Sequence, residues 1–184
     1  MARAAWRAAR AGTSLRLMRH KVILSVVLAG LLAAPGMRAW ADDVEAGIAL
    51  YREGKYAEAE ARLKDATGTE ARAYLAGSLA RQKKYAEAQA QALAVLTDSP
   101  THEVAVAALG EALVGQKKYD DAIERLTAAL AKKDDLAYAY FWRGQAYDKK
   151  NQAARMVADY QAFLKLAPKA PEAPAVQAVL AALR

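Results

Sequence analysis

The chain has 184 residues, which is enough for one domain with a substantial hydrophobic core. It contains no cysteine, so disulfide bonds, a thiol nucleophile and lipidation of a cysteine are excluded. The formal net charge of +7 suggests nucleic acid or a membrane surface as a partner, but residues 1–41 hold seven of the 27 basic residues and none of the 20 acidic ones, which leaves residues 42–184 neutral.

The basic N-terminal segment has the features of a secretory signal peptide. Its apolar run, residues 22–34, is shorter than the roughly 20 residues that a membrane-spanning helix needs. A Pro-Gly pair ends this run, and Ala39 and Ala41 supply the small residues that a signal peptidase requires. We therefore expect cleavage after Ala41, a periplasmic location and no stable membrane insertion of the mature chain.

Two alternatives for this leader remain open. Met18 begins a compact basic start of its own, so translation from Met18 would leave residues 1–17 unmade. The Arg- and Ala-rich segment 1–20 also resembles a mitochondrial transit peptide. Transit peptides lack a continuous apolar block followed by a cleavage site, however, and this favours the secretory interpretation.

The rest of the chain contains an internal repeat. Gln-Lys-Lys-Tyr occurs at Tyr85 and again at Tyr119, 34 residues later, and Glu-Gly-Lys-Tyr occurs at Tyr56, 29 residues before Tyr85. A further step of 34 residues leads to Ala153, in a degenerate fourth copy. We place the shortfall of the first interval in the loop around residues 66–70. A fixed period of this length is typical of stacked helical repeats.

Each copy lies between two segments with helical periodicity. Leu109 and Leu113 precede Tyr119 at helical spacing, and an apolar stripe that includes Leu126 and Leu130 follows it. Residues with high helix propensity dominate the sequence. Pro100 and Pro168 stand where one unit must end, because proline disrupts a helix. These features predict helix–turn–helix units.

The pattern resembles the tetratricopeptide repeat, whose signature is W-x2-L-G-x2-Y…A-x3-F…P. The third copy has Leu109-Gly110, Leu113, Ala122 and Leu126 in these positions, and the second has Leu75-Ala76, Leu79, Ala88 and Pro100. The first has Gly47, Leu50, Ala59 and Leu63, and the fourth has Tyr140, Gly144, Tyr147, Tyr160 and Pro168, with Arg143 and Met156 as departures. The resemblance covers about residues 43–168 and implies an all-α solenoid of about four units.

The small signature residues have a packing role in this prediction. We expect Gly110 and Ala122 to let the two helices of one unit approach closely, and the tyrosine after each turn to pack over that contact. The segment after Pro168 again has apolar residues at helical spacing, and a repeat stack needs a cap on its last unit. The predicted organisation is thus a signal peptide (1–41), the repeat array (42–168) and a ninth, capping helix (169–184).

Few residues are suited to catalysis or to metal binding. His102 is the only histidine after the leader, and position 106 lacks the second histidine of a zinc-protease helix. We expect His102 to be an exposed first-turn residue. The carboxylate pairs at residues 42–43, 120–121 and 134–135 fit helix starts, and the lysine pairs fit turns and helix ends. We expect no enzyme activity, cofactor, metal or nucleic-acid partner.

The resemblance implies a concave face, lined by the first helices of the units, that binds peptides or helices. The family's carboxylate clamp uses groove asparagines, and the chain has one asparagine, Asn151, in a predicted turn. Recognition of a C-terminal carboxylate is therefore not expected. The candidate groove residues are Tyr51, Arg52, Glu70, Arg81, Glu111, Tyr138, Phe141, Gln145 and Lys149.

The fourth copy is rich in aromatic residues. Phe141 and Trp142 occupy no signature position, and adjacent helical residues cannot both face one way, so at least one should be exposed. We hypothesise that Phe141 anchors a partner. The alternative is that these rings pack against the capping helix.

Together these features predict an exported, non-catalytic scaffold or assembly factor that binds a protein segment in its groove. A self-associating structural protein, dimerising through the fourth repeat and the cap, is one alternative, and an accessory subunit of an exported enzyme is another. The sequence leaves open the partner's identity, whether the groove takes a helix or an extended peptide, and whether the chain is a monomer or a homodimer.

Overall fold

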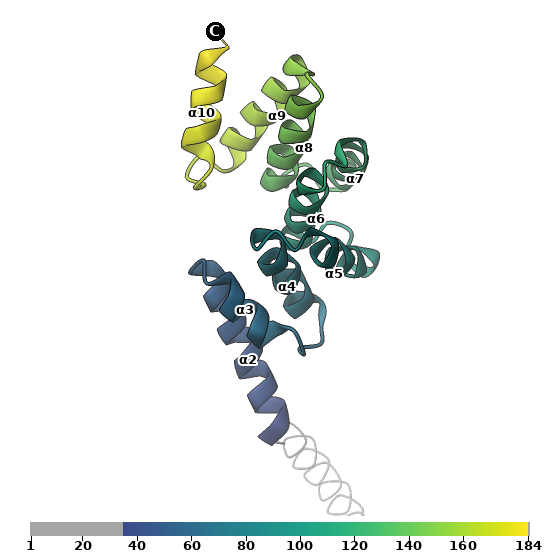
Figure 1. Ribbon diagram of the computed structural model, residues 1–184, viewed down its shortest axis with the longest axis vertical. Helices are drawn as coiled ribbons and strands as arrows, with labels where there is room; N and C mark the ends of the chain where they lie inside the picture. The colour runs from purple at the N-terminus through teal and green to yellow at the C-terminus, as the bar shows by residue number, and fades with distance from the viewer. Residues whose placement is uncertain (1–34, 184) are drawn as a thin grey trace, which may run out of the picture. The chain divides into compact units, whose positions relative to one another are not determined.

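The computed structural model describes residues 35–183, with side chains from residue 42 onward. Most of the predicted signal peptide lies outside these residues. Asp43–Arg184 form one compact unit. The described residues form nine helices and no strand: α2 (Pro35–Arg52), α3 (Tyr56–Leu63), α4 (Thr69–Arg81), α5 (Tyr85–Asp98), α6 (Glu103–Gly115), α7 (Tyr119–Lys132), α8 (Ala137–Lys149), α9 (Ala153–Leu166) and α10 (Ala173–Ala182) (Figure 1).

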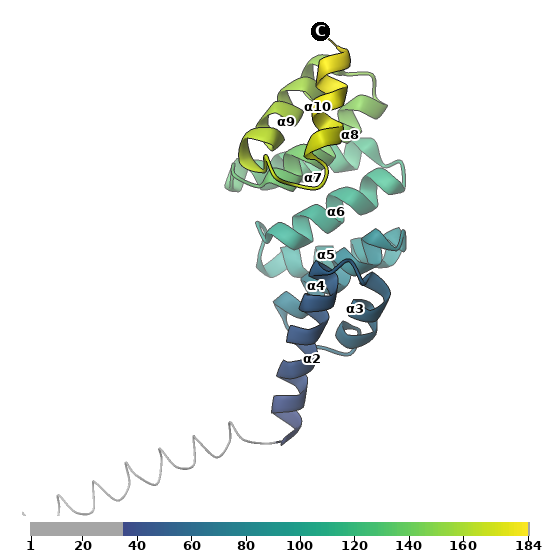
Figure 2. The ribbon, with the colours of Figure 1, turned by 90° about the vertical axis from the view of Figure 1, so that its left-hand side faces the viewer.

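The helices pair into four hairpins, α2/α3, α4/α5, α6/α7 and α8/α9, and α10 follows the last of them, which confirms the predicted fold (Figures 1 and 2). The explanation of the short first interval was wrong. The second helices α5, α7 and α9 have 14 residues each, whereas α3 has 8. The connection from α3 to α4, residues 64–68, is no shorter than the later ones, so the missing residues come from helix α3.

All four hairpin turns have the same backbone conformation. Gly54, Lys83, Lys117 and Asn151 each have a positive φ, between 57° and 79°. In each turn this residue's N–H donates to the carbonyl three positions earlier, and the next N–H donates to the carbonyl five positions earlier, at 2.8–3.0 Å. A left-handed residue that closes a helix in this way is a common helix C-cap. Asn151 therefore marks the fourth turn, even though no tyrosine follows it.

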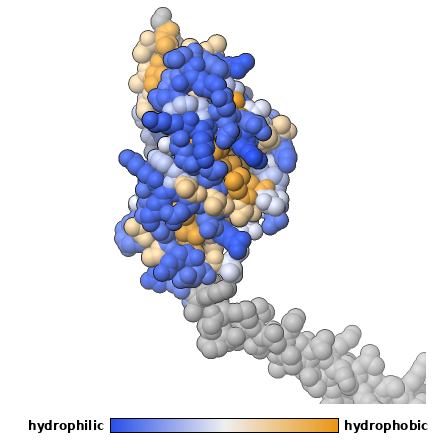
Figure 3. Space-filling view, turned by 45° about the vertical axis from the view of Figure 1, so that its right-hand side comes forward, coloured by the Kyte–Doolittle hydropathy of each residue, from blue (hydrophilic) through white to orange (hydrophobic). Residues whose placement is uncertain are grey.

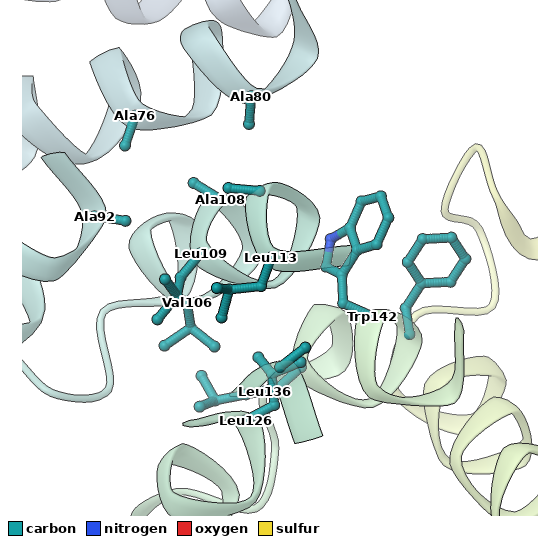
Figure 4. Close-up of a cluster of buried hydrophobic side chains, with 14 of the residues drawn as sticks. Ala76, Ala80, Ala92, Val106, Ala108, Leu109, Leu113, Leu126, Leu136 and Trp142 are labelled. Atoms are coloured by element: carbon teal, nitrogen blue, oxygen red, sulfur yellow. The ribbon is translucent and has the colours of Figure 1, made fainter. Parts of the chain in front are cut away.

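The core runs as one cluster along the array. Leu109 and Leu113 of α6 lie near Leu126 of α7 and Leu136, while alanines of α4, α5 and α6 face one another where the helices approach (Figure 4). The first helices also contact each other directly, α4 with α6 and α6 with α8. Successive units thus share one continuous core, and their first helices form a continuous inner wall.

Gly110 faces the next unit rather than its own partner helix. A Cβ atom on Gly110 would lie 2.7 Å from the Cβ atom of Trp142 in α8. Gly144, by contrast, faces Tyr160 of its own hairpin, where an added Cβ would lie 2.8 Å from the ring. The expectation for Gly110 was therefore wrong in its partner, because the tightest approach of α6 is to the large indole of α8.

The acidic pairs are placed partly as expected. Asp120 and Asp121 lie in the first turn of α7, and residues 134–135 directly precede α8. Residues 42–43, however, lie inside α2 rather than at a helix start, because α2 begins at Pro35. Figure 3 shows one face of the molecule, on which hydrophilic side chains surround small groups of hydrophobic ones.

Candidate partner-binding groove

The inner wall borders a groove of about 660 Å³. Five parts of the chain contribute to it: the first helices α2, α4, α6 and α8, and the segment that precedes α10. The lining side chains include Tyr51, Arg52, Tyr74, Arg81, Val104, Tyr138 and Glu172. This is the concave face that the repeat pattern predicts, because the first helix of every unit lines it.

Four of the nine predicted site residues line this groove: Tyr51, Arg52, Arg81 and Tyr138. Glu111 lies beside them through its contact with Arg81. The other four predicted residues, Glu70, Phe141, Gln145 and Lys149, do not line it.

Arg81, at the end of α4, connects three separate elements. Its Nε lies 3.3 Å from a carboxylate oxygen of Glu111 on α6, and its Nη2 lies 3.2 Å from Oε1 of Glu172. The hydroxyl of Tyr138 on α8 donates to the other oxygen of Glu172, at 2.8 Å. The three charged side chains are only 15–29 % exposed. The result is a shielded network with one cation and two carboxylates.

This environment changes the pKa values of the groups involved. Burial lowers the pKa of Arg81, but Glu111, Tyr51 and Glu172 raise it more, so the net shift is upward and the guanidinium stays charged. Burial raises the pKa of Glu111, and the nearby Glu172 adds to this while Arg81 opposes it. Burial and the hydrogen bond to Glu172 raise the pKa of Tyr138, so its hydroxyl remains a donor.

An aromatic cluster forms the N-terminal end of the groove. The ring of Tyr51 meets those of Tyr56 and Tyr74 edge to face, with centroids 5.5 and 5.2 Å apart. The guanidinium of Arg52 lies 5.9 Å from the centroid of the Tyr74 ring. Burial raises the pKa of Tyr51. The groove thus offers apolar surface beside positive charge.

Three lining residues were missed from the sequence. Tyr74 precedes Arg81 by two helical turns, so the helical period could have placed both on one face. Tyr56 was assigned only to the turn. Glu172 lies outside the repeats, in the connection to α10, where no periodicity indicates which way a side chain points.

The expectation that Phe141 or Trp142 is exposed was wrong. Phe141 is 6 % exposed and Trp142 8 %. The two rings do point in different directions, but each meets a neighbouring helix. Phe141 lies 5.1 Å from Phe163 of α9, while Trp142 packs on Gly110 of α6. Phe141 is therefore a core residue and not a partner anchor.

The remaining predicted residues lie elsewhere. Glu70, at the start of α4, contacts the Nε2 atom of His102 at 2.9 Å. The His102 side chain is only 17 % exposed, so the expectation that it is exposed was wrong. Gln145 is half-buried on α8. Lys149 is exposed, and its Nζ lies 3.1 Å from Asp148.

Within residues 35–183, no helix is both long enough and apolar enough to cross a membrane. Nor do three or more histidine or acidic side chains of this part gather where they could hold a metal ion.

Comparison with known proteins identifies the family. Residues 79–146 match the family model described as tetratricopeptide repeat. TTC0263, a thermophilic TPR protein in Thermus thermophilus, is 19 % identical over 78 % of this chain and 80 % of that one, with a TM-score of 0.67. MamA (41-end) from Desulfovibrio magneticus RS-1 is 26 % identical over 72 % and 77 %, with a TM-score of 0.57.

A search of curated protein sequences found no match to this chain. The repeat family nevertheless accounts for the observed hairpins and for the groove along their first helices. Its fold is generally a scaffold for protein–protein interaction, and its members are typically non-catalytic. With four hairpins in the register of the sequence repeat, this chain belongs to the tetratricopeptide-repeat family.

Proposed function

We propose that the mature chain is an exported, non-catalytic scaffold or assembly factor that binds a segment of a partner protein in its groove. The observation that carries the proposal is the composition of the groove wall. Tyr51, Tyr74 and Tyr138 supply aromatic surface there, and Arg52 and Arg81 supply positive charge. Tyrosine and arginine are among the residues that contribute most to binding energy at protein interfaces.

The groove wall is also held in place before any partner binds. The ion pairs of Arg81 and the edge-to-face contacts of Tyr51 fix these side chains across helices α2, α4 and α6. A preformed surface loses less side-chain entropy on binding, and this favours affinity. Because several helices contribute, the contacts extend along the array, as binding of a polypeptide segment requires.

Export rests on the predicted signal peptide. Cleavage after Ala41 would leave the groove intact, since Tyr51 and Arg52 lie beyond that position in α2. In a bacterial host we expect the mature protein in the osmotic-shock fraction, with a mass that corresponds to a start at Asp42. Recovery of the uncleaved chain in the cytoplasm would argue against export.

Site-specific photo-crosslinking tests the groove itself. We would place a photoreactive phenylalanine at Val104, which lines the groove, and at Ala128, an exposed residue on the second helix α7, as a matched control. A partner in the groove should give protein adducts from position 104 and not from position 128. Adducts of equal yield at both positions would indicate nonspecific contact and contradict the proposal.

A second candidate, self-association through the C-terminal end, is favoured by a separate observation. Val179 and Leu183 of α10 are 41 % and 56 % exposed. A hollow of about 330 Å³ lies between α9 and α10, lined by Val157, Gln161, Leu164, Leu180 and Leu183. Analytical ultracentrifugation of the wild type and of Val179→Glu tests this: a dimer that the substitution dissociates would support self-association, and a wild-type monomer at all concentrations would refute it.

A further inference from the structure

Glu172 reaches the groove from outside the repeat array. It belongs to the connection between α9 and α10, and it is separated from Arg81 by 91 residues in sequence. Its side chain nevertheless extends between the first helices of two different units. The groove is thus partly occupied by a residue of the chain's own C-terminal segment.

The contacts of Glu172 are those of a bound carboxylate. One oxygen accepts from Arg81 on α4, and the other accepts from the hydroxyl of Tyr138 on α8. Charge-assisted hydrogen bonds of this kind are stronger than neutral ones. If Glu172 moved away, Arg81 would keep Glu111 as its counter-ion, but one of its N–H groups and the Tyr138 hydroxyl would be free to hold another carboxylate.

The fold allows this movement without loss of the cap. Helix α10 packs on α9, and its buried residues Ala173 and Val176 are 2 % and 3 % exposed. Glu172 precedes the helix, and only its backbone carbonyl is used there, as acceptor for the N–H of Val176. The side chain can therefore swing out of the groove while α10 remains seated.

The other charges of the groove favour an acidic ligand. Glu103 and Asp135 also line it, but Lys133 lies 3.0 and 3.5 Å from their carboxylates. Among the described residues, no carboxylate forms an ion pair with Arg52. Once Glu172 is displaced, Arg52 and Arg81 are therefore the charges that attract a ligand.

We propose that the partner segment presents an acidic side chain that displaces Glu172 and takes its place between Arg81 and Tyr138. Glu172 is then a built-in competitor that lowers the affinity of the groove until a segment with the right carboxylate arrives. This inference rests on the groove function proposed above. The affinity of the free chain is reduced in proportion to the fraction of molecules in which Glu172 occupies the site.

Selection from a random peptide library tests the proposal. A phage library of 12-residue peptides would be selected on the full chain carrying Glu172→Ala, and labelled synthetic copies of the enriched peptides would be titrated by fluorescence anisotropy. We expect enrichment of Asp or Glu in the selected peptides. They should bind Glu172→Ala about tenfold or more tightly than the wild type, the effect of about one charge-assisted hydrogen bond.

Two comparisons make the result specific. Glu103→Ala removes an acidic residue that also lines the groove but does not contact Arg81, so it should leave the affinity near the wild-type value. Adding Tyr138→Phe to Glu172→Ala removes one hydroxyl donor and should weaken binding about tenfold. Adding Arg81→Met should abolish it, and circular dichroism would confirm that each variant is folded.

The outcomes separate this inference from the groove function. Peptides that bind wild type and Glu172→Ala equally, but are lost when groove tyrosines are replaced, would leave the groove function standing and overturn the role of Glu172. Selected peptides without acidic residues would overturn it as well. A failure to enrich any peptide on either chain would count against both proposals.

Discussion

Arg143 and Asp159 form a two-point ion pair between the helices of the α8/α9 hairpin. The Nε and Nη2 atoms of Arg143 donate to the two oxygens of Asp159 at 2.8 and 2.7 Å. The hydrogen bond to Asp159 raises the pKa of Arg143. The pair explains why the fourth unit carries arginine where the repeat signature has leucine: the second helix of the same hairpin supplies a carboxylate in place of an apolar surface.

Loss of Arg143 alone should destabilise the protein strongly. Asp159 is 4 % exposed, so Arg143→Met would leave a buried carboxylate without its counter-ion. We expect a loss of about 3–5 kcal/mol in the free energy of unfolding, measured by urea denaturation. The double substitution Arg143→Leu, Asp159→Leu should recover most of this loss, because two apolar side chains can replace a buried pair. A single variant as stable as the wild type would show that Asp159 is not shielded from water.

A methyl group at Gly110 should also reduce stability. Alanine in a helix interior is normally favoured over glycine by about 1 kcal/mol. At Gly110 the new Cβ atom would lie 2.7 Å from the Cβ of Trp142, an atom close to the backbone that cannot move aside. Overpacking costs about 1–3 kcal/mol, so we expect Gly110→Ala to lower the free energy of unfolding by about 1–2 kcal/mol.

Thermal and urea unfolding of Gly110→Ala would measure this effect. Ala128→Gly, on the exposed face of α7, is the control that reports helix propensity alone. A gain in stability for Gly110→Ala would place the contact between α6 and α8 elsewhere.

The repeat made the fold predictable from sequence. The turns follow one rule, since a residue two positions before Tyr56, Tyr85, Tyr119 or Ala153 has a positive φ. A 34-residue period therefore located the hairpins even where the signature had degenerated. The period says nothing about the length of a single helix, and for this reason the shortening of α3 was assigned to a loop.

The groove was predictable only where the repeat places residues. Tyr51, Arg81 and Tyr138 belong to first helices, and their side chains do line it. Whether Phe141 is exposed depends on α9, which covers it, and helical spacing within α8 cannot show this. Glu172 lies beyond the array, and its contact with Arg81 depends on how the connection to α10 folds back.

Replacing Lys117 by glycine should stabilise the protein. Lys117 closes the turn between α6 and α7 with a φ of 62°, a conformation that costs an ordinary residue about 1 kcal/mol and glycine much less. We expect Lys117→Gly to raise the free energy of unfolding by about 0.5–1 kcal/mol in urea denaturation. Lys118→Gly is the matched control, because Lys118 has an ordinary φ of −85° and should gain nothing. Equal effects of the two substitutions would mean that backbone conformation is not the cause.

Tyr160 should make the fold sensitive to alkaline pH. Burial, together with the charge of Asp148, raises the pKa of Tyr160 from 10.0 to about 12. In the unfolded chain the phenol titrates near its ordinary value, so above about pH 10 the unfolded state loses this proton first. The contribution of Tyr160 to stability is therefore fully present below about pH 10 and is lost as the pH rises through about 12. Tyr160→Phe should lose less stability than the wild type between about pH 9 and about pH 11, measured by urea denaturation at each pH. Some dependence should remain in this variant, because the pKa values of Tyr51 and Tyr138 are also raised. Identical pH profiles for the two proteins would show that the Tyr160 hydroxyl is exposed to water.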